Sequence, residues 1–410
     1  MKTKENDIEN RSAVFGLLIA RIVYAINWFN IASIFSYMAA DFNQGISSLG
    51  LISAGFFVGV GAFQIPGGIL AAKLGPRKTA IYGIMISSSA ALLCGVTSNL
   101  QQIEALRFVV GVGMALFFSS SVTLITRYLR KGSEGLAVGL LNSAHSVGGV
   151  VGLFGWVILA EIIGWRQSLV ISGGVGLASG LLLILWLPKE DNLYRSFQIK
   201  IADVLRVLLD RHMFGLGVVL LGAQIAWAVT LTFIVFYLED HLKVNSALAG
   251  LAASMSLVFA LIAAPIFGRI YDRTNNVKRM LLSCGLAMSV SIVGIAFSTT
   301  LYLVIISVLS VGVFSAAVFT ITYTAAQGTI AKKRSETDGV ELEFDKTLAI
   351  SWVNGISLFG AFWVPIIFSI IVHQAGYASA WLISGMATLL FILPALGIKK
   401  FKDTKTDRPN

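Results

Sequence analysis

Twelve long apolar segments follow one another along the 410 residues of this chain, with only short polar breaks between them. A helix needs about 20 apolar residues to cross a bilayer. Because backbone polar groups in a bilayer must be satisfied within the segment, helices are the expected form. The sequence therefore predicts an all-α membrane protein with 12 transmembrane helices, near residues 13–38, 47–72, 78–98, 101–127, 135–162, 167–188, 213–238, 246–271, 279–298, 300–330, 347–373 and 377–397.

The basic residues support this number of spans. Of the 31 lysines and arginines, 27 fall in the terminal segments and in every second polar break, whereas the other breaks hold only Arg166 and Lys243. The positive-inside rule then places both termini in the cytoplasm and the chain in the cytoplasmic membrane. The net charge of +10 reflects this topology, so no nucleic-acid partner is expected. Only 13% of the residues are charged, which argues against a soluble enzyme.

The longest polar break, residues 189–212, divides the chain. It is predicted to separate an N-terminal six-helix bundle (1–188) from a C-terminal one (213–410). Charged residues alternate with Val204, Leu205, Val207 and Leu208 in this break, which is typical of an amphipathic helix at a membrane surface. The segment is therefore interpreted as a cytoplasmic linker helix.

The two halves also share local sequence. Gly68 and Lys73 near the end of the second span match Gly268 and Arg273 near the end of the eighth. Asn142 and Gly148 have the same six-residue spacing as Asn354 and Gly360. Parallel repeats of this kind occur in transporters that bind substrate between two halves near the bilayer midplane.

The stretch Gln64-Ile-Pro-Gly-Gly-Ile-Leu-Ala-Ala-Lys-Leu-Gly-Pro-Arg-Lys78 is similar to the signature of the major facilitator superfamily between spans two and three. The resemblance implies two pseudo-symmetric six-helix bundles and alternating-access transport. Ala72 stands where the family has Asp, which the second copy keeps as Asp272. Two interpretations stay open for these residues, a cytoplasmic gate between the halves or simple anchoring by positive charge: Gly68, Lys73, Arg77, Lys78, Gly268, Asp272 and Arg273.

Three further stretches resemble the anion:cation symporter group of that superfamily. They are Tyr24 to Ala32, Arg107 to Ala115, and Glu134 to Ser143 followed by Gly164-Trp-Arg166. The resemblance implies a small organic anion as substrate. The chain departs from the group at Asn27-Trp28, where an Asp-Arg pair is usual, and at Met114, where Glu is frequent. The carboxylates associated with ion coupling in that group are therefore missing here.

Polar side chains inside the spans are the candidate binding residues, because charge within a bilayer is costly. Arg21 either faces a cavity or snorkels to the surface, and Arg107 either binds an anion or pairs with Glu104. His145 either faces the cavity, where it could carry a proton, or packs between helices. The other candidates are Asn27, Asn30, Asn142, Gln224, Trp227, Tyr323, Gln327, Trp352 and Asn354.

None of the 21 acidic residues falls at the middle of a span. A cavity whose buried charges are arginines attracts anions. The leading hypothesis is therefore a secondary or facilitative transporter of a small organic anion, a carboxylate, with H+ as a candidate coupling ion. A neutral-sugar or amphipathic-drug transporter and a non-transporting solute sensor remain alternatives. No enzyme activity, cofactor or metal site is expected, since Cys94 and Cys284 lie apart in apolar segments. The expected partners are the substrate and the bilayer, and a monomer is expected.

Overall fold

The computed structural model describes residues 2–43, 46–129, 132–189, 201–244, 246–274, 276–333 and 340–398. The regular elements of these residues are helices. In chain order they are α1 (Lys2–Ser33), α2 (Phe35–Phe42), α3 (Ile46–Ala62), α4 (Gln64–Leu74), α5 (Pro76–Val96), α6 (Leu100–Tyr128), α7 (Glu134–Val150), η1 (Val151–Gly155), α8 (Trp156–Ile163), α9 (Trp165–Trp186), α11 (Ile201–Leu208), α12 (Arg211–Asp240), α13 (Ser246–Thr274), α14 (Val277–Ala296), α15 (Leu301–Lys333), α16 (Val340–Ala361), α17 (Val364–Ile392) and η2 (Leu393–Gly397).

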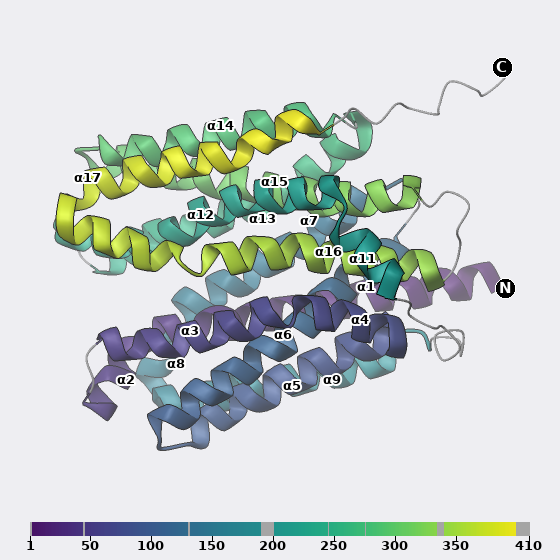
Figure 1. Ribbon diagram of the computed structural model, residues 1–410. Helices are drawn as coiled ribbons and strands as arrows, with labels where there is room; N and C mark the ends of the chain where they lie inside the picture. The colour runs from purple at the N-terminus through teal and green to yellow at the C-terminus, as the bar shows by residue number, and fades with distance from the viewer. Residues whose placement is uncertain are drawn as a thin grey trace.

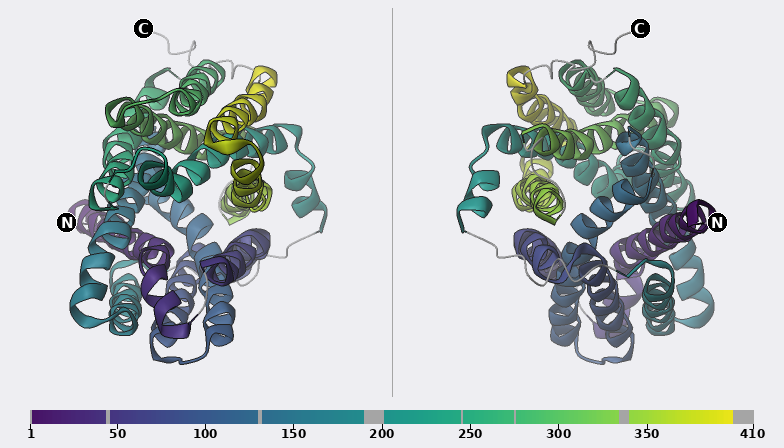
Figure 2. Two further views of the ribbon diagram at one scale, coloured as in Figure 1. Left: turned by 90° about the vertical axis from the view of Figure 1, so that its left-hand side faces the viewer. Right: turned by 90° about the vertical axis from the view of Figure 1, so that its right-hand side faces the viewer.

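The helices run roughly side by side and form two groups (Figures 1 and 2). One group contains α1 to α9, held together by the packing of α5 on α6 and α9 and of α1 on α7. The other contains α12 to α17, in which α14 packs on α15 and α17 and α12 packs on α16 and α17. The two groups meet mainly where α7 packs on α13 and α4 packs on α16. The site described below lies between these groups.

One end of the molecule collects the start of α1, the α6–α7 connection, α11 and η2 (Figure 1). We call it the basic end, because the lysine- and arginine-rich breaks of the sequence belong to it. The short helix α11 packs against α16 at this end. Of the predicted linker 189–212, residues 190–200 lie outside the described residues.

Within the described residues, 11 helices are long and apolar enough to cross a membrane. The twelfth predicted span is present as α3 and α4, two shorter helices that break at Phe63. Large apolar side chains are exposed along the outside of the molecule, whereas serines, threonines and amides are buried within it. The prediction of an all-α membrane protein with twelve spans in two six-helix groups is confirmed.

Two spans predicted as continuous are broken, and a proline explains each break. A proline has no N–H to donate to the carbonyl four residues earlier, and its ring clashes with that carbonyl. Pro66 lies four residues after Ala62, the last residue of α3, and Pro365 lies four residues after Ala361, the last residue of α16. The predicted segments 47–72 and 347–373 are therefore each two helical pieces.

Pro265 behaves differently, because it lies inside α13 without ending the helix. The carbonyl of Leu261, four residues earlier, accepts a hydrogen bond of 2.5 Å from the Ser143 hydroxyl of α7 instead. A side chain from the other half thus satisfies the acceptor that the proline leaves open.

The break predicted between the last two spans, at 374–376, is present as a single kink in α17. Only Gly376, with φ of 79°, departs from helical geometry there. Glycine adopts a positive φ without steric cost, so this residue marks the corner between the last two spans.

Candidate functional site

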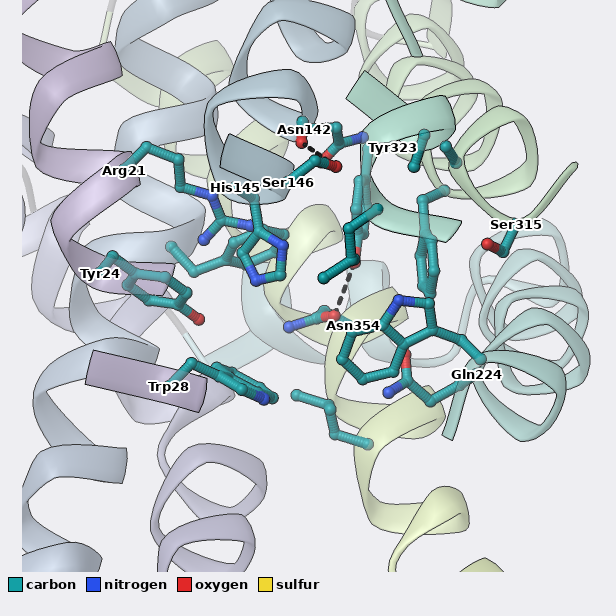
Figure 3. A pocket seen from close by; sticks show the side chains of 17 residues that line it. Arg21, Tyr24, Trp28, Asn142, His145, Ser146, Gln224, Ser315, Tyr323 and Asn354 are labelled. Carbon is teal, nitrogen blue, oxygen red and sulfur yellow. Dashed lines mark hydrogen bonds between the residues drawn. The ribbon is translucent and has the colours of Figure 1, made fainter. Parts of the chain in front are cut away.

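A cavity lies between the two groups of helices, lined by α1, α6 and α7 from one group and by α12, α13, α15 and α16 from the other. Figure 3 shows side chains from both groups pointing into it. Its wall consists of Arg21, Tyr24, Trp28, Phe118, Asn142, His145, Ser146, Gln224, Trp227, Leu257, Ala260, Ser315, Ala316, Phe319, Tyr323, Asn354 and Leu358. None of these described lining residues is acidic, so the cavity has a formally positive wall.

Arg21 is the charged residue of this wall, and it is 5% exposed. Its guanidinium carbon lies 4.3 Å from the centre of the Tyr24 ring and 4.9 Å from that of the Phe118 ring. Both contacts are cation–π interactions, which stabilise a cation without neutralising it. Its Nε and Nη1 atoms are buried and have no hydrogen-bond partner among the described residues. Buried donors without partners are costly, so this guanidinium is suited to donate hydrogen bonds to an anionic ligand.

The opposite wall is polar but uncharged. The Tyr323 hydroxyl donates to the Asn354 side-chain oxygen at 2.7 Å, which joins α15 to α16 (Figure 3). Gln224 and Trp227 of α12 lie beside this pair on the wall. Such groups can orient a ligand by hydrogen bonding without adding charge.

Asn142, His145 and Ser146 of α7 complete the wall. The Asn142 side-chain nitrogen donates to the Thr320 hydroxyl at 2.9 Å and so links the two groups of helices. His145 lies among aromatic rings, with ring centres 6.0 Å from Tyr24, 6.1 Å from Trp28 and 5.6 Å from Phe29. The imidazole of His145 thus lines the cavity and is surrounded by aromatic rings.

Of the residues predicted from the sequence to bind ligand, the structure brings seven to this wall: Arg21, Asn142, His145, Gln224, Trp227, Tyr323 and Asn354. Trp352 and Gln327 are not among the lining residues. The indole nitrogen of Trp352 is buried without a hydrogen-bond partner in the described part of the chain. The side-chain nitrogen of Gln327 donates to the Thr126 hydroxyl at 3.3 Å, between the two groups.

Asn27, Asn30 and Arg107 form a separate polar cluster inside the first group of helices. Arg107 Nη1 donates to the backbone carbonyl of Asn27 at 2.9 Å. Ser172 of α9 bonds the side chains of both Asn27 and Asn30. No ion pair joins Arg107 to Glu104 among the described residues, so the predicted pair is replaced by this contact with a carbonyl.

The helical period explains why these residues do not line the cavity. Successive residues of an α-helix are rotated by roughly 100°. Arg21, Tyr24 and Trp28 therefore share one face of α1, whereas Asn30 lies roughly 180° from Arg21. The same spacing is a signal in the sequence for Tyr24 and Trp28, neither of which was predicted as a site residue. Phe118, Phe319, Ser146 and Ser315 also line it, and no sequence pattern distinguishes them from packing residues.

A second set of contacts joins the two groups nearer the basic end. Asp272, near the end of α13, accepts hydrogen bonds from the backbone N–H groups of Gly135 at 2.8 Å and of Leu136 at 3.0 Å. These N–H groups belong to the first turn of α7, whose dipole favours a carboxylate. Asp272 therefore caps a helix of the opposite group.

Two glycines allow the helices to approach closely here. A Cβ atom built on Gly268 would overlap the carbonyl oxygen of Gly135, and one built on Gly68 would lie 2.6 Å from the Ser351 hydroxyl of α16. Side chains larger than glycine do not fit in this arrangement. We call the contact of Gly135 with Gly268 and Asp272 the glycine seam.

A ladder of three polar pairs runs along α6 and α16 toward the basic end. The Ser119 and Ser351 hydroxyls are 2.9 Å apart, and those of Thr123 and Thr347 are 2.8 Å apart. Arg127 and Glu343 form an ion pair at the outer end. Each partner is four residues from the next, so one face of each helix supplies the ladder. This spacing is present in the sequence, although none of these residues was predicted to join the two halves.

The basic residues proposed for the gate have other positions. Arg77 donates to the backbone carbonyls of Leu187 at 3.0 Å and Ile184 at 2.8 Å, at the end of α9 in its own group. Lys73, Lys78 and Arg273 are exposed. Within the described residues, no hydrogen bond joins these three to the opposite group. Their positions fit the anchoring interpretation better than a gate.

Comparison with known proteins identifies the family of this chain. The family model described as Major Facilitator Superfamily matches residues 17–338 and 216–410. The probable sulfoacetate transporter SauU of Cupriavidus necator is 24% identical over 309 residues, which cover 70% of this chain and 71% of that protein. The nitrite extrusion protein of Bacillus subtilis is 22% identical, with 89% of each chain covered.

Two solved structures have the same fold. The human organic anion transporter MFSD10 superimposes with a TM-score of 0.77 at 12% identity, covering 94% of this chain and 99% of that one. FucP, the E. coli fucose:proton symporter, superimposes in its outward conformation with a TM-score of 0.73 at 15% identity, covering 94% and 98%.

Proposed function

This chain belongs to the Major Facilitator Superfamily, and from that premise we propose that it carries a small organic anion, a carboxylate, through its central cavity. Members of the family are transporters and not enzymes, so the chain is a multi-pass membrane transporter of a small molecule. The identity of that molecule is the subject of the proposal.

The observation that carries the proposal is the buried guanidinium of Arg21, whose Nε and Nη1 atoms have no hydrogen-bond partner among the described residues. It is buried in the cavity wall, it is stacked on two aromatic rings, and no described acidic residue lines the cavity. A carboxylate would supply the acceptors that Arg21 lacks, since guanidinium and carboxylate geometries match. Relatives named for sulfoacetate and nitrite carry anions, which supports the same charge class.

Binding between two halves fits an alternating-access cycle. The ligand would contact Arg21 and His145 from one half and the Tyr323–Asn354 pair from the other. We propose that the glycine seam and the polar ladder close the path between the cavity and the basic end, because both join the two halves nearer that end. In the proposed cycle these contacts open once per turnover, and Asp272, Gly68 and Gly268 act as gate residues. By the positive-inside rule the basic end faces the cytoplasm, and with it both termini.

Coupling is proposed to follow from the missing carboxylates. No acidic residue lines the described cavity wall, so proton transfer through a buried carboxylate has no candidate there. The proposed modes are anion exchange, uniport, or cotransport of a proton on the substrate or on His145. Uptake into liposomes, with and without an imposed pH gradient, distinguishes these modes.

The test compares ligand classes and variants by thermal unfolding of the purified protein. A ligand at 100 times its dissociation constant stabilises by about 2.7 kcal/mol. We expect this effect from organic carboxylates and not from neutral sugars or organic cations. Arg21→Gln removes charge-assisted hydrogen bonds of about 1.5–3 kcal/mol, so it weakens carboxylate binding by about 10- to 150-fold.

Arg107→Gln serves as the control, because Arg107 lies outside the cavity wall. Stabilisation by sugars or cations alone would refute the anion assignment and leave Arg21 a structural role. An equal loss of carboxylate binding in both variants would refute the role of Arg21 in particular. Carboxylate binding without any uptake or exchange in liposomes would indicate a solute sensor.

A further inference from the structure

A second hollow lies on the outside of the molecule, beside the glycine seam. It is an open groove lined by Leu136, Pro265, Ile266, Arg269, Ile270 and Arg273. Leu136 belongs to α7 and the other residues to α13, so the two halves of the transporter each contribute to its walls. A molecule in this groove would contact both halves at once.

Arg269 and Arg273 supply two positive charges at one end of the groove. They are four residues apart and therefore lie on the same face of α13. Both are exposed, and no described carboxylate pairs with either. The nearby acids are engaged elsewhere, because Asp272 accepts from the first turn of α7 and Glu134 accepts from the Gly132 N–H at 3.2 Å.

An apolar stripe continues from these arginines along α13. Ile270, Ile266 and Ile262 follow one another at intervals of four residues, and Phe259 extends the row. Their side chains are 39%, 51%, 55% and 40% exposed, respectively, on a helix that crosses the membrane. From Arg269 to Ile262 the stripe rises roughly 10 Å into the apolar zone. In a bilayer crossed by α13, the charged pair would lie toward the membrane surface and the stripe within the hydrocarbon.

We propose that this groove binds an anionic phospholipid. The phosphate would lie between the Arg269 and Arg273 guanidinium groups, which match phosphate geometry and remain charged. One acyl chain would follow Ile270, Ile266 and Ile262, where apolar surface is otherwise open to the bilayer. Basic residues at the surface of the hydrocarbon attract anionic lipids. This assignment does not depend on which substrate the central cavity takes.

The test uses native mass spectrometry of the full chain in detergent, with phosphatidylglycerol or phosphatidylcholine added. It measures the lipid that stays bound when the protein is released from the detergent. We expect phosphatidylglycerol adducts on the wild type that phosphatidylcholine does not match. The double variant Arg269→Gln/Arg273→Gln should bind phosphatidylglycerol roughly 25-fold more weakly, at roughly fivefold for each basic residue. Leu136→Trp, which fills the groove without changing its charge, should weaken binding as well.

Arg211→Gln/Arg279→Gln is the matched control, because it removes two exposed arginines at the same end of the molecule, outside the groove. An equal loss in this control would overturn the proposal, since binding would then follow surface charge in general. Inorganic phosphate that displaces phosphatidylglycerol adducts at low concentration would also overturn it, since the acyl stripe would then contribute nothing. The thermal unfolding midpoint of each variant is first compared with that of wild type. If the arginine variants do not fold, the binding of phosphatidylglycerol to Leu136→Trp alone tests the proposal.

Discussion

A methyl group added at the glycine seam should lower the population of the conformation in which the seam is closed. In Gly268→Ala the new Cβ would overlap the carbonyl oxygen of Gly135 and lie 2.6 Å from its carbonyl carbon and 3.1 Å from the Leu136 nitrogen. These are backbone atoms, which cannot rotate away. Overpacking of this kind costs about 1–3 kcal/mol. The cost arises only while the seam is closed, so the closed state should lose about 5- to 150-fold in population relative to the open one.

Distances between two spin labels measure this population directly. Labels on Arg11→Cys and Arg279→Cys would report from opposite halves at the basic end, where both positions are exposed. The native Cys94 and Cys284 are buried, which limits their reaction with a labelling reagent. We expect Gly268→Ala to increase the share of long distances, with a thermal unfolding midpoint close to that of wild type.

Gly215→Ala is the control, because no atom lies within 4 Å of a Cβ built on Gly215, which lies near the start of α12. If Gly268→Ala gives the same distance distribution as this control, the seam does not determine the conformational equilibrium. If it lowers the unfolding midpoint without any change in distances, the seam contributes to folding and not to gating. Either result would refute the reasoning.

Two further predictions concern polar contacts toward the basic end. Thr123→Val and Thr347→Val should show a coupling of about 1 kcal/mol in a double-mutant cycle of the same distance populations. Either single variant already removes the one hydrogen bond that the two hydroxyls share across the halves, and the remaining hydroxyl can still donate to a carbonyl of its own helix. Burial raises the pKa of Asp210, but its hydrogen bond from Lys333 and those from the N–H groups of α12 outweigh this and leave the pKa lowered. Because the pKa is lowered in the folded state, the ionised Asp210 stabilises the fold at pH values above its unfolded pKa of about 4. This stabilisation is lost as the pH falls through the folded pKa. Asp210→Asn should therefore destabilise at pH 7 and approach wild type in unfolding measurements near pH 3.

The spans and their topology could be predicted because a bilayer imposes a length and a charge rule on every segment. The breaks at Phe63 and near Trp363 could not be placed from hydropathy, since the helical pieces on both sides of each break are apolar. The local rule for proline would have placed them, because each break begins four residues before Pro66 or Pro365.

The candidate site was harder to predict, because a membrane helix is apolar on most faces. Arg21, Asn27 and Asn30 are all polar residues of one helix, yet only Arg21 faces the cavity. Which face of α1 looks toward the centre depends on the packing of α7 and α9 against it, and these contacts are remote in sequence. Polarity therefore identified the candidates, and the fold separated them.

The π-helical turn at Val151–Gly155 sets the orientation of everything that follows it in the fifth span. A π turn takes in one residue more than an α turn, so it acts as a one-residue insertion in the register of the helix. Beyond it, Trp156 and Ala160 point inward, whereas Ile158 and Ile162 point to the outside. Removing one residue from this turn would rotate α8 by roughly 100° and bring a different set of side chains to the inside. The register of this span is thus set locally, by five residues, and not by the apolar pattern on either side.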